Sequence, residues 1–600
     1  MAAELRELAR ALDGLLEQVS ARESTLAHLL AATPAPTRPS ARNLAHYLAL
    51  RSGDLRPLQQ QLASLGLSSL GRAENDVAGS LATVRAVLAR LLGETMELPS
   101  IDFGAASRRL AAHANALLGP ASGGRPTRVM VTLPGEAALD PSFADAVIDA
   151  GTEMVRINCA HDGPEQWVAM ATHARAAAAA RGRDVRIQAD LAGPKLRTGT
   201  VVARRDVVRY RPLRDRFGAT VTPARIPLRV RGTSAAGVPI SAGLLDTLAD
   251  GDTLRLRDAR GRKREWIIER SGEAVFGLCD RTSYVTPGLQ VEASRGRELL
   301  ALFRLDDELF DLGLPLVAGD RFTLVAEDAP RSARPVHPEV GCLEPAVFAF
   351  VRAGERVLFD DGKLAGTIEH AAPERVLVRI DHTRRGGATL RADRGINLPD
   401  TALALPLFRE RDVAALRAVA AHVDLIGLSF VHAPAEVEHA RQLVTEAGRP
   451  DLGLVLKIET RHAFEQLPQL LFAALANMPA GVMVARGDLA AEVGFERLAE
   501  VQEEILWLCE AAHLPCIWAT QVLDQLARTG MPSRAEVTDA AMGARSECVM
   551  LNKGPFVVDA VHLLVDVLER MEAHHAKKRS LLRRLAVTAD ALAEGGDPGP

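Results

Sequence analysis

Aromatic side chains are scarce in this sequence, at 4% of 600 residues, so a surface that stacks nucleic-acid bases is not expected. Charge of one sign is not in excess either. The 72 Lys and Arg residues face 76 Asp and Glu, a formal net charge of −4, which argues against a dedicated nucleic-acid binder. No apolar run approaches the roughly 20 residues of a membrane span. The amino terminus has leucines at helical spacing but no signal-peptide core. We therefore expect a soluble cytoplasmic protein with no nucleic-acid or membrane partner.

Cysteine is also infrequent. The six cysteines are scattered and include no CxxC pair. This pattern is typical of reduced thiols and indicates neither a disulfide framework nor a zinc site. The chain is too long for one core, and its 48% hydrophobic content is ample for two to four domains.

The spacing of hydrophobic residues differs between two parts of the chain. Residues 1–120 repeat apolar positions every three or four residues and predict a helical region, for which the sequence suggests no role. After a linker at 119–127, short β-prone segments alternate with longer helical ones, as expected for a (β/α)₈ barrel. The eight expected strands lie at 128–133, 153–158, 184–190, 423–430, 453–459, 480–486, 514–520 and 548–552.

A β-rich segment interrupts this alternation after the third strand. Residues 200–395 are rich in Val, Ile, Thr and turn residues and predict an inserted, β-barrel-like lid domain. The barrel itself is assigned to 125–199 and 396–580, and the polar tail at 581–600 is expected to be disordered. Inside the insertion, "GDTLRLRD" and "GERVLFDD" share a Gly-acidic pattern that suggests an internal duplication.

Polar residues gather where the predicted strands end. In a closed parallel barrel, the carboxyl ends of the strands form one mouth, where catalytic groups are found. In "LVLKIE", alternation places Lys457 and Glu459 on one side of the strand. The other polar residues at these ends are Arg156, Asn158, His161, Asp190, Lys195, Arg197, Asp488 and Thr520.

These residue types suit phosphoryl transfer. The carboxylates of Glu459 and Asp488 could share a hard cation such as Mg²⁺, with Mn²⁺ as the alternative ion. Cations from Arg156, Arg197 and Lys457 would stand around it. Positioning and electrostatic stabilisation are what phosphoryl transfer requires of a protein.

Eight segments in order then resemble the motifs of the pyruvate kinase family. They are "VRINCAH", "DLAGPKLRTG", "DDGKLAG", "RGINLP", "LKIE", "VARGDLAAEV", "ATQVLDQL" and "PSRAEVTDAA". The resemblance covers 128–200 and about 350–580. It implies transfer of a phosphoryl group from phosphoenolpyruvate to ADP, giving pyruvate and ATP, under a closing lid.

The resemblance also implies roles for residues at the substrate. Lys457 would neutralise the phosphoryl and enolate oxygens, and Arg156 would bind the transferring phosphate. Glu459 and Asp488 would hold Mg²⁺. The substrate carboxylate would lie at the backbone of Gly487 and Asp488, and Thr520 would stand where the enolate is protonated. The nucleotide phosphates would contact Asn158, His161, Arg197 and Arg394.

The sequence departs from the family at its monovalent-cation site. Asn158 and Asp190 remain, but Ala160 and Leu191 replace the expected Ser and Thr. Lys195 stands where the family often has Glu, so its ammonium could replace the ion. We therefore expect that activity does not require potassium.

Further departures leave alternatives open. "NKGP" at 552–555 replaces an "SGET"-like segment, Ala490 replaces a Gly, and His432 replaces an Arg. One alternative is a catalytically weakened regulatory protein that binds phosphoenolpyruvate or nucleotide. Another is an Mg²⁺-enolate lyase or aldolase of a related barrel. The family's assembly suggests a homo-oligomer, either a dimer or a tetramer.

Overall fold

The computed structural model describes residues 2–580 except 98, 100, 101, 103, 123–124, 206, 231–236, 273, 306–308, 330–335, 404, 573 and 578. The predicted tail at 581–600 lies outside the described residues. The described chain forms two compact units, residues 1–195 with 406–600 and residues 196–405. Each unit is considered separately below.

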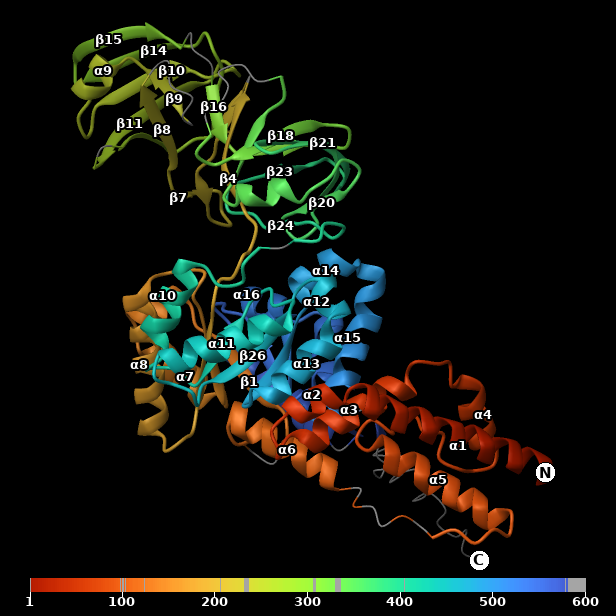
Figure 1. Ribbon diagram of the computed structural model, residues 1–600. Coiled ribbons are helices and arrows are strands. Elements are labelled where there is room, and N and C mark those ends of the chain that lie inside the picture. Colours follow the sequence, from red (N-terminus) through yellow and green to blue (C-terminus); the bar gives the residue numbers. More distant parts are fainter. Residues whose placement is uncertain are drawn as a thin grey trace, which may run out of the picture. The chain divides into compact units, whose positions relative to one another are not determined.

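The first unit contains a closed barrel of eight parallel strands, which confirms the predicted fold (Figure 1). All eight expected strands are present, and β29 pairs with β1 to close the ring. The strands are β1 (Arg128–Thr132), β2 (Met154–Asn158), β3 (Arg186–Asp190), β25 (Leu425–Leu428), β26 (Gly453–Ile458), β27 (Ala480–Ala485), β28 (Cys516–Val522) and β29 (Cys548–Leu551).

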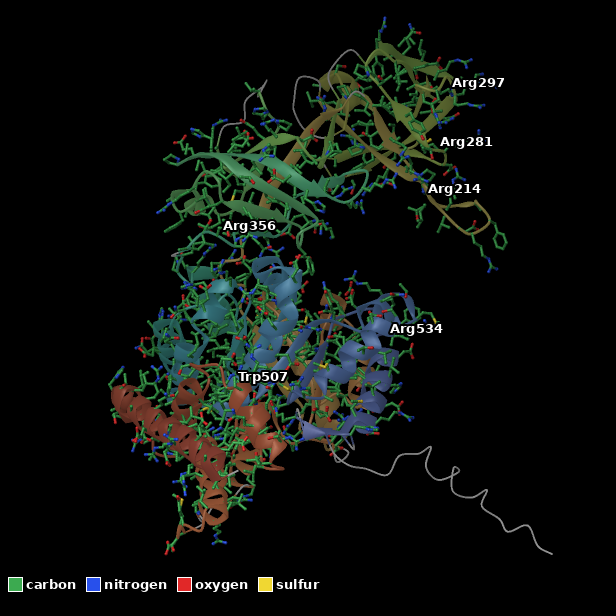
Figure 2. All side chains as sticks on the ribbon, turned by 90° about the vertical axis from the view of Figure 1, so that its right-hand side faces the viewer. Arg214, Arg281, Arg297, Arg356, Trp507 and Arg534 are labelled. Atoms are coloured by element: carbon green, nitrogen blue, oxygen red, sulfur yellow. The ribbon has the colours of Figure 1, made fainter. Side chains whose placement is uncertain are left out.

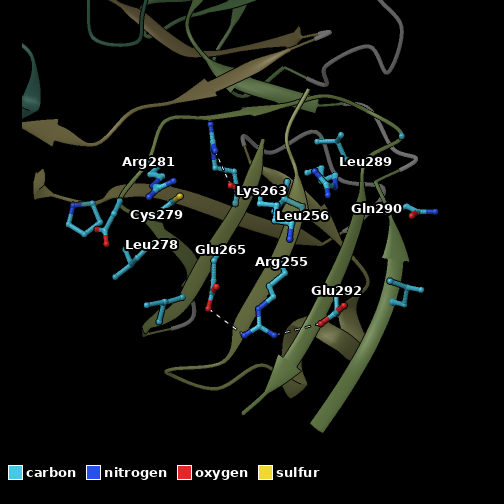
Figure 3. A pocket seen from close by; sticks show the side chains of 17 residues that line it. Arg255, Leu256, Lys263, Glu265, Leu278, Cys279, Arg281, Leu289, Gln290 and Glu292 are labelled. Carbon is cyan, nitrogen blue, oxygen red and sulfur yellow. Dashed lines mark hydrogen bonds and ion pairs between the residues drawn. The ribbon is translucent and has the colours of Figure 1, made fainter. Parts of the chain in front are cut away.

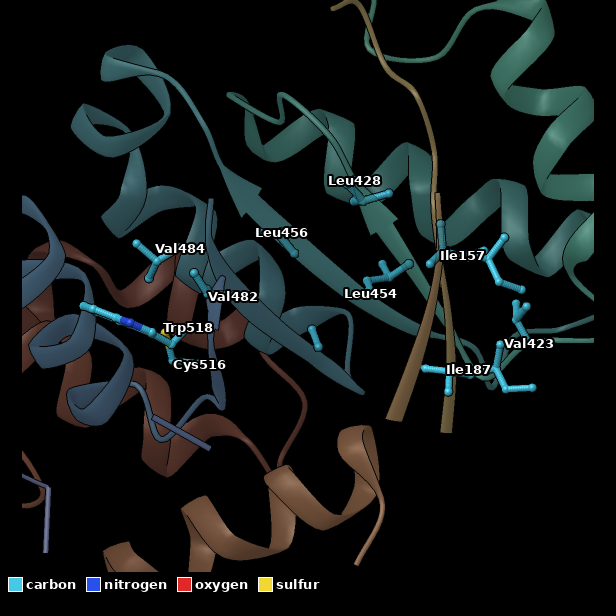
Figure 4. Close-up of a cluster of buried hydrophobic side chains, with 14 of the residues drawn as sticks. Ile157, Ile187, Val423, Leu428, Leu454, Leu456, Val482, Val484, Cys516 and Trp518 are labelled. Atoms are coloured by element: carbon cyan, nitrogen blue, oxygen red, sulfur yellow. The ribbon is translucent and has the colours of Figure 1, made fainter. Parts of the chain in front are cut away.

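Helices follow the strands and cover the outside of the barrel. The principal ones are α7 (Ser142–Asp149), α8 (Pro164–Ala180), α10 (Glu410–Val419), α11 (Pro434–Glu446), α13 (Leu467–Ala476), α15 (Phe495–Ala511), α17 (Arg534–Gly543) and α18 (Val557–Glu572). Every second strand residue faces these helices. Leu454 and Leu456 of β26, for example, pack outward in the largest hydrophobic cluster (Figure 4).

The other strand residues face the barrel interior, which is apolar at one end and polar at the other. Met130, Met154, Val455 and Met483 form a buried cluster toward the amino ends of their strands. Two residues further along, the same strand faces carry Thr132, Arg156, Lys457 and Ala485. Strand alternation therefore brings charged side chains to the carboxyl mouth.

In the described part of the chain, six helices precede the barrel. They are α1 (Ala2–Thr25), α2 (Ala27–Ala32), α3 (Arg38–Leu50), α4 (Arg56–Ser64), α5 (Val77–Leu91) and α6 (Ala105–Leu118). Leu117 at the end of α6 joins the apolar cluster inside the barrel. A Cβ at Gly453 would lie 2.4 Å from Leu117 Cδ1, and one at Gly481 would lie 2.6 Å from Leu117 Cδ2. Helix α6 therefore closes the amino-terminal end of the barrel, where only glycine leaves room for Leu117.

The second unit contains two large sheets with separate hydrophobic cores. The strands of the eight-stranded sheet are, in order, β16 (Leu309–Leu312), β4 (Thr198–Arg205), β19 (Glu339–Cys342), β18 (Arg321–Ala326), β22 (Arg375–Thr383), β21 (Leu364–Ala372), β20 (Arg356–Phe359) and β24 (Ile396–Asn397). The strands of the seven-stranded sheet are, in order, β15 (Glu298–Arg304), β14 (Gln290–Arg295), β10 (Thr253–Arg257), β11 (Lys263–Ser271), β12 (Ala274–Cys279), β8 (Ala224–Val230) and β9 (Val238–Ile240). Strand β4 (Thr198–Arg205) pairs with β16 (Leu309–Leu312), so the chain between them forms an insertion within the insertion. We call residues 208–305 the nested lobe.

The proposed duplication corresponds to a recurrent local turn. Gly251 N–H donates to the Ile268 carbonyl at 3.0 Å, and Gly354 N–H donates to the Ile368 carbonyl at 2.8 Å. The same bond joins Gly319 N–H to a carbonyl, that of Ile380, at 2.8 Å. Each glycine has a positive φ and is followed by an acidic residue that stands immediately before a strand. The shared pattern therefore marks the entry to a strand, and the internal duplication stays a prediction.

Candidate active site

Lys457 lies at the centre of a buried charge cluster at the barrel mouth. Its Nζ is 3.2 Å from Asp190 Oδ2 and 3.1 Å from Glu459 Oε1, and it donates to Ser429 Oγ at 2.7 Å. Burial alone would lower the pKa of this lysine. The charges of Asp190 and Glu459 outweigh burial and raise it, so the side chain remains an ammonium.

Asp190 connects Lys457 to Arg156. The Arg156 guanidinium donates from Nε to Asp190 Oδ2 at 2.7 Å and from Nη1 to Thr132 Oγ1 at 3.2 Å. Gln188 donates to the other oxygen of Asp190 at 2.6 Å. Although burial favours the neutral acid, Arg156 and Lys457 hold the Asp190 pKa well below its usual value. A Cβ at Gly427 would lie 2.0 Å from Asp190 Oδ1, so this arrangement requires glycine there.

Glu459 and Asp488 form the acidic side of the mouth. Glu459 Oε2 accepts a hydrogen bond from Phe430 N–H at 2.6 Å. Burial raises the pKa of Glu459 against the attraction of Lys457, and the negative charge of Asp488 raises it further. Two carboxylates that repel each other in a buried site are a suitable pair for a divalent cation. Their donor set therefore fits Mg²⁺.

Lys195 is paired with one of these carboxylates. Its Nζ lies 3.0 and 2.8 Å from the two oxygens of Asp488, and it also lowers the Glu459 pKa. Asn158 and Asp190, the other residues assigned to the monovalent-cation position, lie side by side on β2 and β3. The Asn158 side-chain oxygen accepts from Ala160 N–H at 3.2 Å.

Thr520 and Gly487 form another pair at the mouth. Gly487 N–H donates to Thr520 Oγ1 at 2.9 Å. Thr520 has a φ of +67°, which is rare for a β-branched residue and costs of the order of 1–3 kcal/mol. Arg486 holds this strained segment by donating to the Ala519 and Thr520 carbonyls at 2.9 and 2.5 Å.

Asp539 in turn fixes Arg486. It accepts from Arg486 Nη2 at 2.8 Å, while the guanidinium stacks over Trp518 at 4.6 Å from the ring centroid. Arg486 and Asp539 were not among the predicted site residues. Arg486 ends the expected strand at 480–486 but was given no role there, and Asp539 lies inside helix α17, away from every strand end. The positive φ of Thr520, which reveals their importance, has no sequence signal.

A pocket of about 340 Å³ opens beside Arg156. It brings Arg156 together with Asn158 and His161, as expected for a phosphate-binding region. The other seven lining residues were not predicted as site residues, and they include Asp162 and, with polar side chains from later in the chain, Arg528, Asn552 and Lys553. The last two belong to the "NKGP" departure, which therefore places a cation in this pocket.

The remaining predicted nucleotide contacts belong to the second unit. Arg197 Nη1 lies 3.2 Å from Asp393 Oδ1, and Arg394 Nη1 lies 3.5 Å from Asp360 Oδ1. Within their unit these arginines are held by acidic neighbours. Their contact with a nucleotide stays a prediction.

Two negative findings apply to the described ranges. No group of three or more His, Cys, Asp or Glu residues there could hold a metal ion by itself, so a bound cation would need further oxygen donors. None of the helices described is long and apolar enough to cross a membrane.

Comparison with known proteins finds a similarity that covers part of the chain. The family described as "Pyruvate kinase, barrel domain" matches residues 309–560. The chain is 31% identical to pyruvate kinase PKLR of Rattus norvegicus over 39% of this chain and 41% of the relative. It is 28% identical to pyruvate kinase of Chlamydia muridarum over 42% of this chain and 52% of that protein. The matched segment thus spans about half or less of each of these relatives.

Proposed function

We propose that the chain belongs to the pyruvate kinase family and that it transfers the phosphoryl group of phosphoenolpyruvate to ADP. The ester P–O bond of phosphoenolpyruvate breaks, a P–O bond to ADP forms, and the enolate takes a proton to give pyruvate. The observation that carries the proposal is the buried Lys457 ammonium, which lies between Asp190 and Glu459 and shares Asp190 with Arg156.

Arg156 and Lys457 supply the positive charge that this reaction requires. The migrating phosphoryl group carries negative charge on three oxygens, and the leaving enolate oxygen gains charge as the bond breaks. Because Asp190 fixes both cations in advance, little reorganisation is needed when that charge develops. Arg156 binds the phosphoryl group, and Lys457 neutralises the oxygens on both sides of the breaking bond.

Glu459 and Asp488 are the residues that would hold Mg²⁺, or Mn²⁺ as the alternative ion. Such an ion usually keeps several waters and completes its shell with substrate oxygens. When bound, it would supply further charge neutralisation at the phosphoryl group. Lys195, which now neutralises Asp488, would remain beside the substrate and supply the charge of a monovalent ion. We therefore propose potassium-independent activity.

Gly487 and Thr520 position the other end of the substrate. The backbone at Gly487 and Asp488 begins helix α14 (Arg486–Val493), whose amino end favours an anion such as the substrate carboxylate. The Thr520 hydroxyl, held near this backbone, would stand where the enolate receives its proton. Asn158, His161, Arg197 and Arg394 are proposed to contact the nucleotide phosphates. We place the enzyme in the cytoplasm as a homo-oligomer, a dimer or a tetramer.

A coupled assay of pyruvate formation from phosphoenolpyruvate and ADP tests the proposal directly. Turnover that depends on both substrates and on Mg²⁺ is the expected result. Binding of phosphoenolpyruvate without turnover would favour the weakened regulatory protein, which the "NKGP" departure and Ala490 make the principal alternative. Enolate formation without phosphoryl transfer would favour a lyase or aldolase.

A further inference from the structure

The nested lobe differs from the rest of the chain in its charge. Residues 208–305 contain 18 Lys and Arg against 11 Asp and Glu, a net charge of +7 in a chain whose total is −4. Seventeen of these 18 cations are arginines. Arg214, Arg281 and Arg297 illustrate this concentration (Figure 2). The nested lobe is therefore strongly basic although the full chain is nearly neutral, and a basic surface attracts anions.

A pocket of about 1110 Å³ lies in this lobe (Figure 3). Its walls come mainly from β10 (Thr253–Arg257), β11 (Lys263–Ser271), β12 (Ala274–Cys279) and β14 (Gln290–Arg295). Five cations line it, namely Arg255, Arg257, Lys263, Arg264 and Arg281. All belong to the lobe itself, so the pocket is complete without any other part of the chain.

Two of the five cations are already neutralised. Arg255 stands between Glu265 and Glu292, at 3.5 and 3.7 Å from their nearest oxygens. Arg264 lies 2.8 Å from the buried carboxylate of Asp258. These pairs account for their charge within the fold.

The other three cations, Arg257, Lys263 and Arg281, form no ion pair with any residue that the structure describes. Arg257 does donate a hydrogen bond to the Gly261 carbonyl at 3.2 Å. Arg257 and Lys263 are moreover directly opposite each other on β10 and β11. Like charges at such a cross-strand pair repel each other. Both side chains are exposed, so solvent screens much of this repulsion, and an anion between them would remove the rest while remaining open to both cations.

The lining also limits what kind of anion fits. None of its 17 residues is aromatic, so it offers no platform for stacked bases. Its carboxylates would repel an extended polyanion. Ile267, Leu278 and Leu302 give it an apolar area, and its volume, somewhat above the roughly 300–1,000 Å³ usual for small-ligand pockets, leaves room for a small molecule. Arginine binds phosphate groups through paired N–H donors.

We propose that the nested lobe binds a small phosphorylated molecule, with its phosphate groups at Arg257, Lys263 and Arg281 and its carbon skeleton toward Ile267 and Leu278. This site is separate in sequence from the proposed active-site residues and does not depend on the reaction assigned to them.

The test uses the full chain, with inorganic pyrophosphate as the probe in isothermal titration. In the double variant Arg257→Glu/Lys263→Glu, the Kd for pyrophosphate at the pocket should rise about tenfold or more, equivalent to roughly 1.4 kcal/mol. The control Arg209→Glu/Arg297→Glu makes the same change of net charge at exposed positions outside the pocket and should leave that Kd unchanged. Should the double variant fail to fold, Arg281→Gln serves in its place.

Equal weakening in pocket and control variants would overturn the proposal, as would unchanged binding in the pocket variants. A short DNA duplex and a poly-glutamate peptide are titrated as two further probes. Binding of either through the pocket residues, without competition by pyrophosphate, would replace the proposal with a macromolecular partner. Pyruvate formation by the same variants is measured separately, so the two proposals can fail independently.

Discussion

The ammonium of Lys195 lies 2.8 and 3.0 Å from the two carboxylate oxygens of Asp488. The two residues are 293 positions apart and come from segments that follow different barrel strands. Ala160 and Leu191 offer no side-chain oxygen, so two ligands that the family resemblance implies for a monovalent cation are missing, and Lys195 is the fixed cation proposed to replace that ion.

Activity is therefore expected to change by less than about twofold when potassium is added to a buffer free of sodium and potassium. Lys195→Gln should lose at least about tenfold in kcat/KM, roughly 1.4 kcal/mol of transition-state stabilisation. Potassium should restore little of this loss, because the ligand set for the ion is incomplete. A large stimulation of the unmodified enzyme by potassium would refute this role of Lys195.

Lys457→Ala should reduce kcat by at least about 10²–10³, as expected when a group that stabilises developing charge is removed. The variant also leaves Glu459 buried without its closest cation, so thermal unfolding must be measured alongside. Ser429→Ala is a milder control variant, because it keeps Lys457 and removes only the hydroxyl that Lys457 contacts at 2.7 Å. It should lose a few-fold in kcat at most. Equal rates for Lys457→Ala and the unmodified enzyme would exclude the proposed mechanism.

The barrel was predictable because each of its strands carries a local signal. Alternation placed Lys457 and Glu459 on one face, and the same rule put Arg156 and Asp190 inside the mouth. The pairing of Lys195 with Asp488 was not predictable, because it depends on how separate loops fold over the rim. Charge repulsion at Arg257 and Lys263 likewise became visible only with the register of β10 and β11.

Asp539→Asn tests whether the Arg486 contacts position Thr520. The substitution weakens the ion pair that fixes the largely buried Arg486, so the strained backbone at Thr520 should relax. We expect kcat to fall by about tenfold to 100-fold, with a smaller change in KM for phosphoenolpyruvate. If Asp539 were merely structural, the melting temperature would fall while kcat of the folded fraction stayed unchanged.

Lys553→Ala tests the cation contributed by "NKGP". Lys553 lines the same pocket as Arg156, Asn158 and His161, so its ammonium is placed to contact nucleotide phosphates. The KM for ADP should rise by roughly fivefold to tenfold, a loss of about 1 kcal/mol, while the KM for phosphoenolpyruvate changes less. Lys553→Arg retains the charge and should restore most of the ADP affinity. An equal rise in both KM values would argue against a nucleotide contact.

His513 joins the amino-terminal helices to the barrel and predicts how stability depends on pH. Its Nε2 donates to the Asn75 carbonyl at 2.9 Å, so in the neutral ring Nδ1 accepts from the Ser40 hydroxyl at 3.0 Å. Its own carbonyl accepts from His113 Nδ1 at 2.7 Å. Burial lowers the pKa of His513 from 6.5 to about 4.

Because the unfolded chain protonates this histidine at higher pH than the folded protein does, the unfolded state binds more protons between these values. The stabilisation that neutral His513 gives to the folded state is therefore complete above pH 6.5 and is lost as pH falls toward 4. At most about 3 kcal/mol of the free energy of unfolding is involved. Urea unfolding across this range should show the loss, and His513→Gln should flatten the slope. An unchanged slope in the variant would show that other groups control the acid sensitivity.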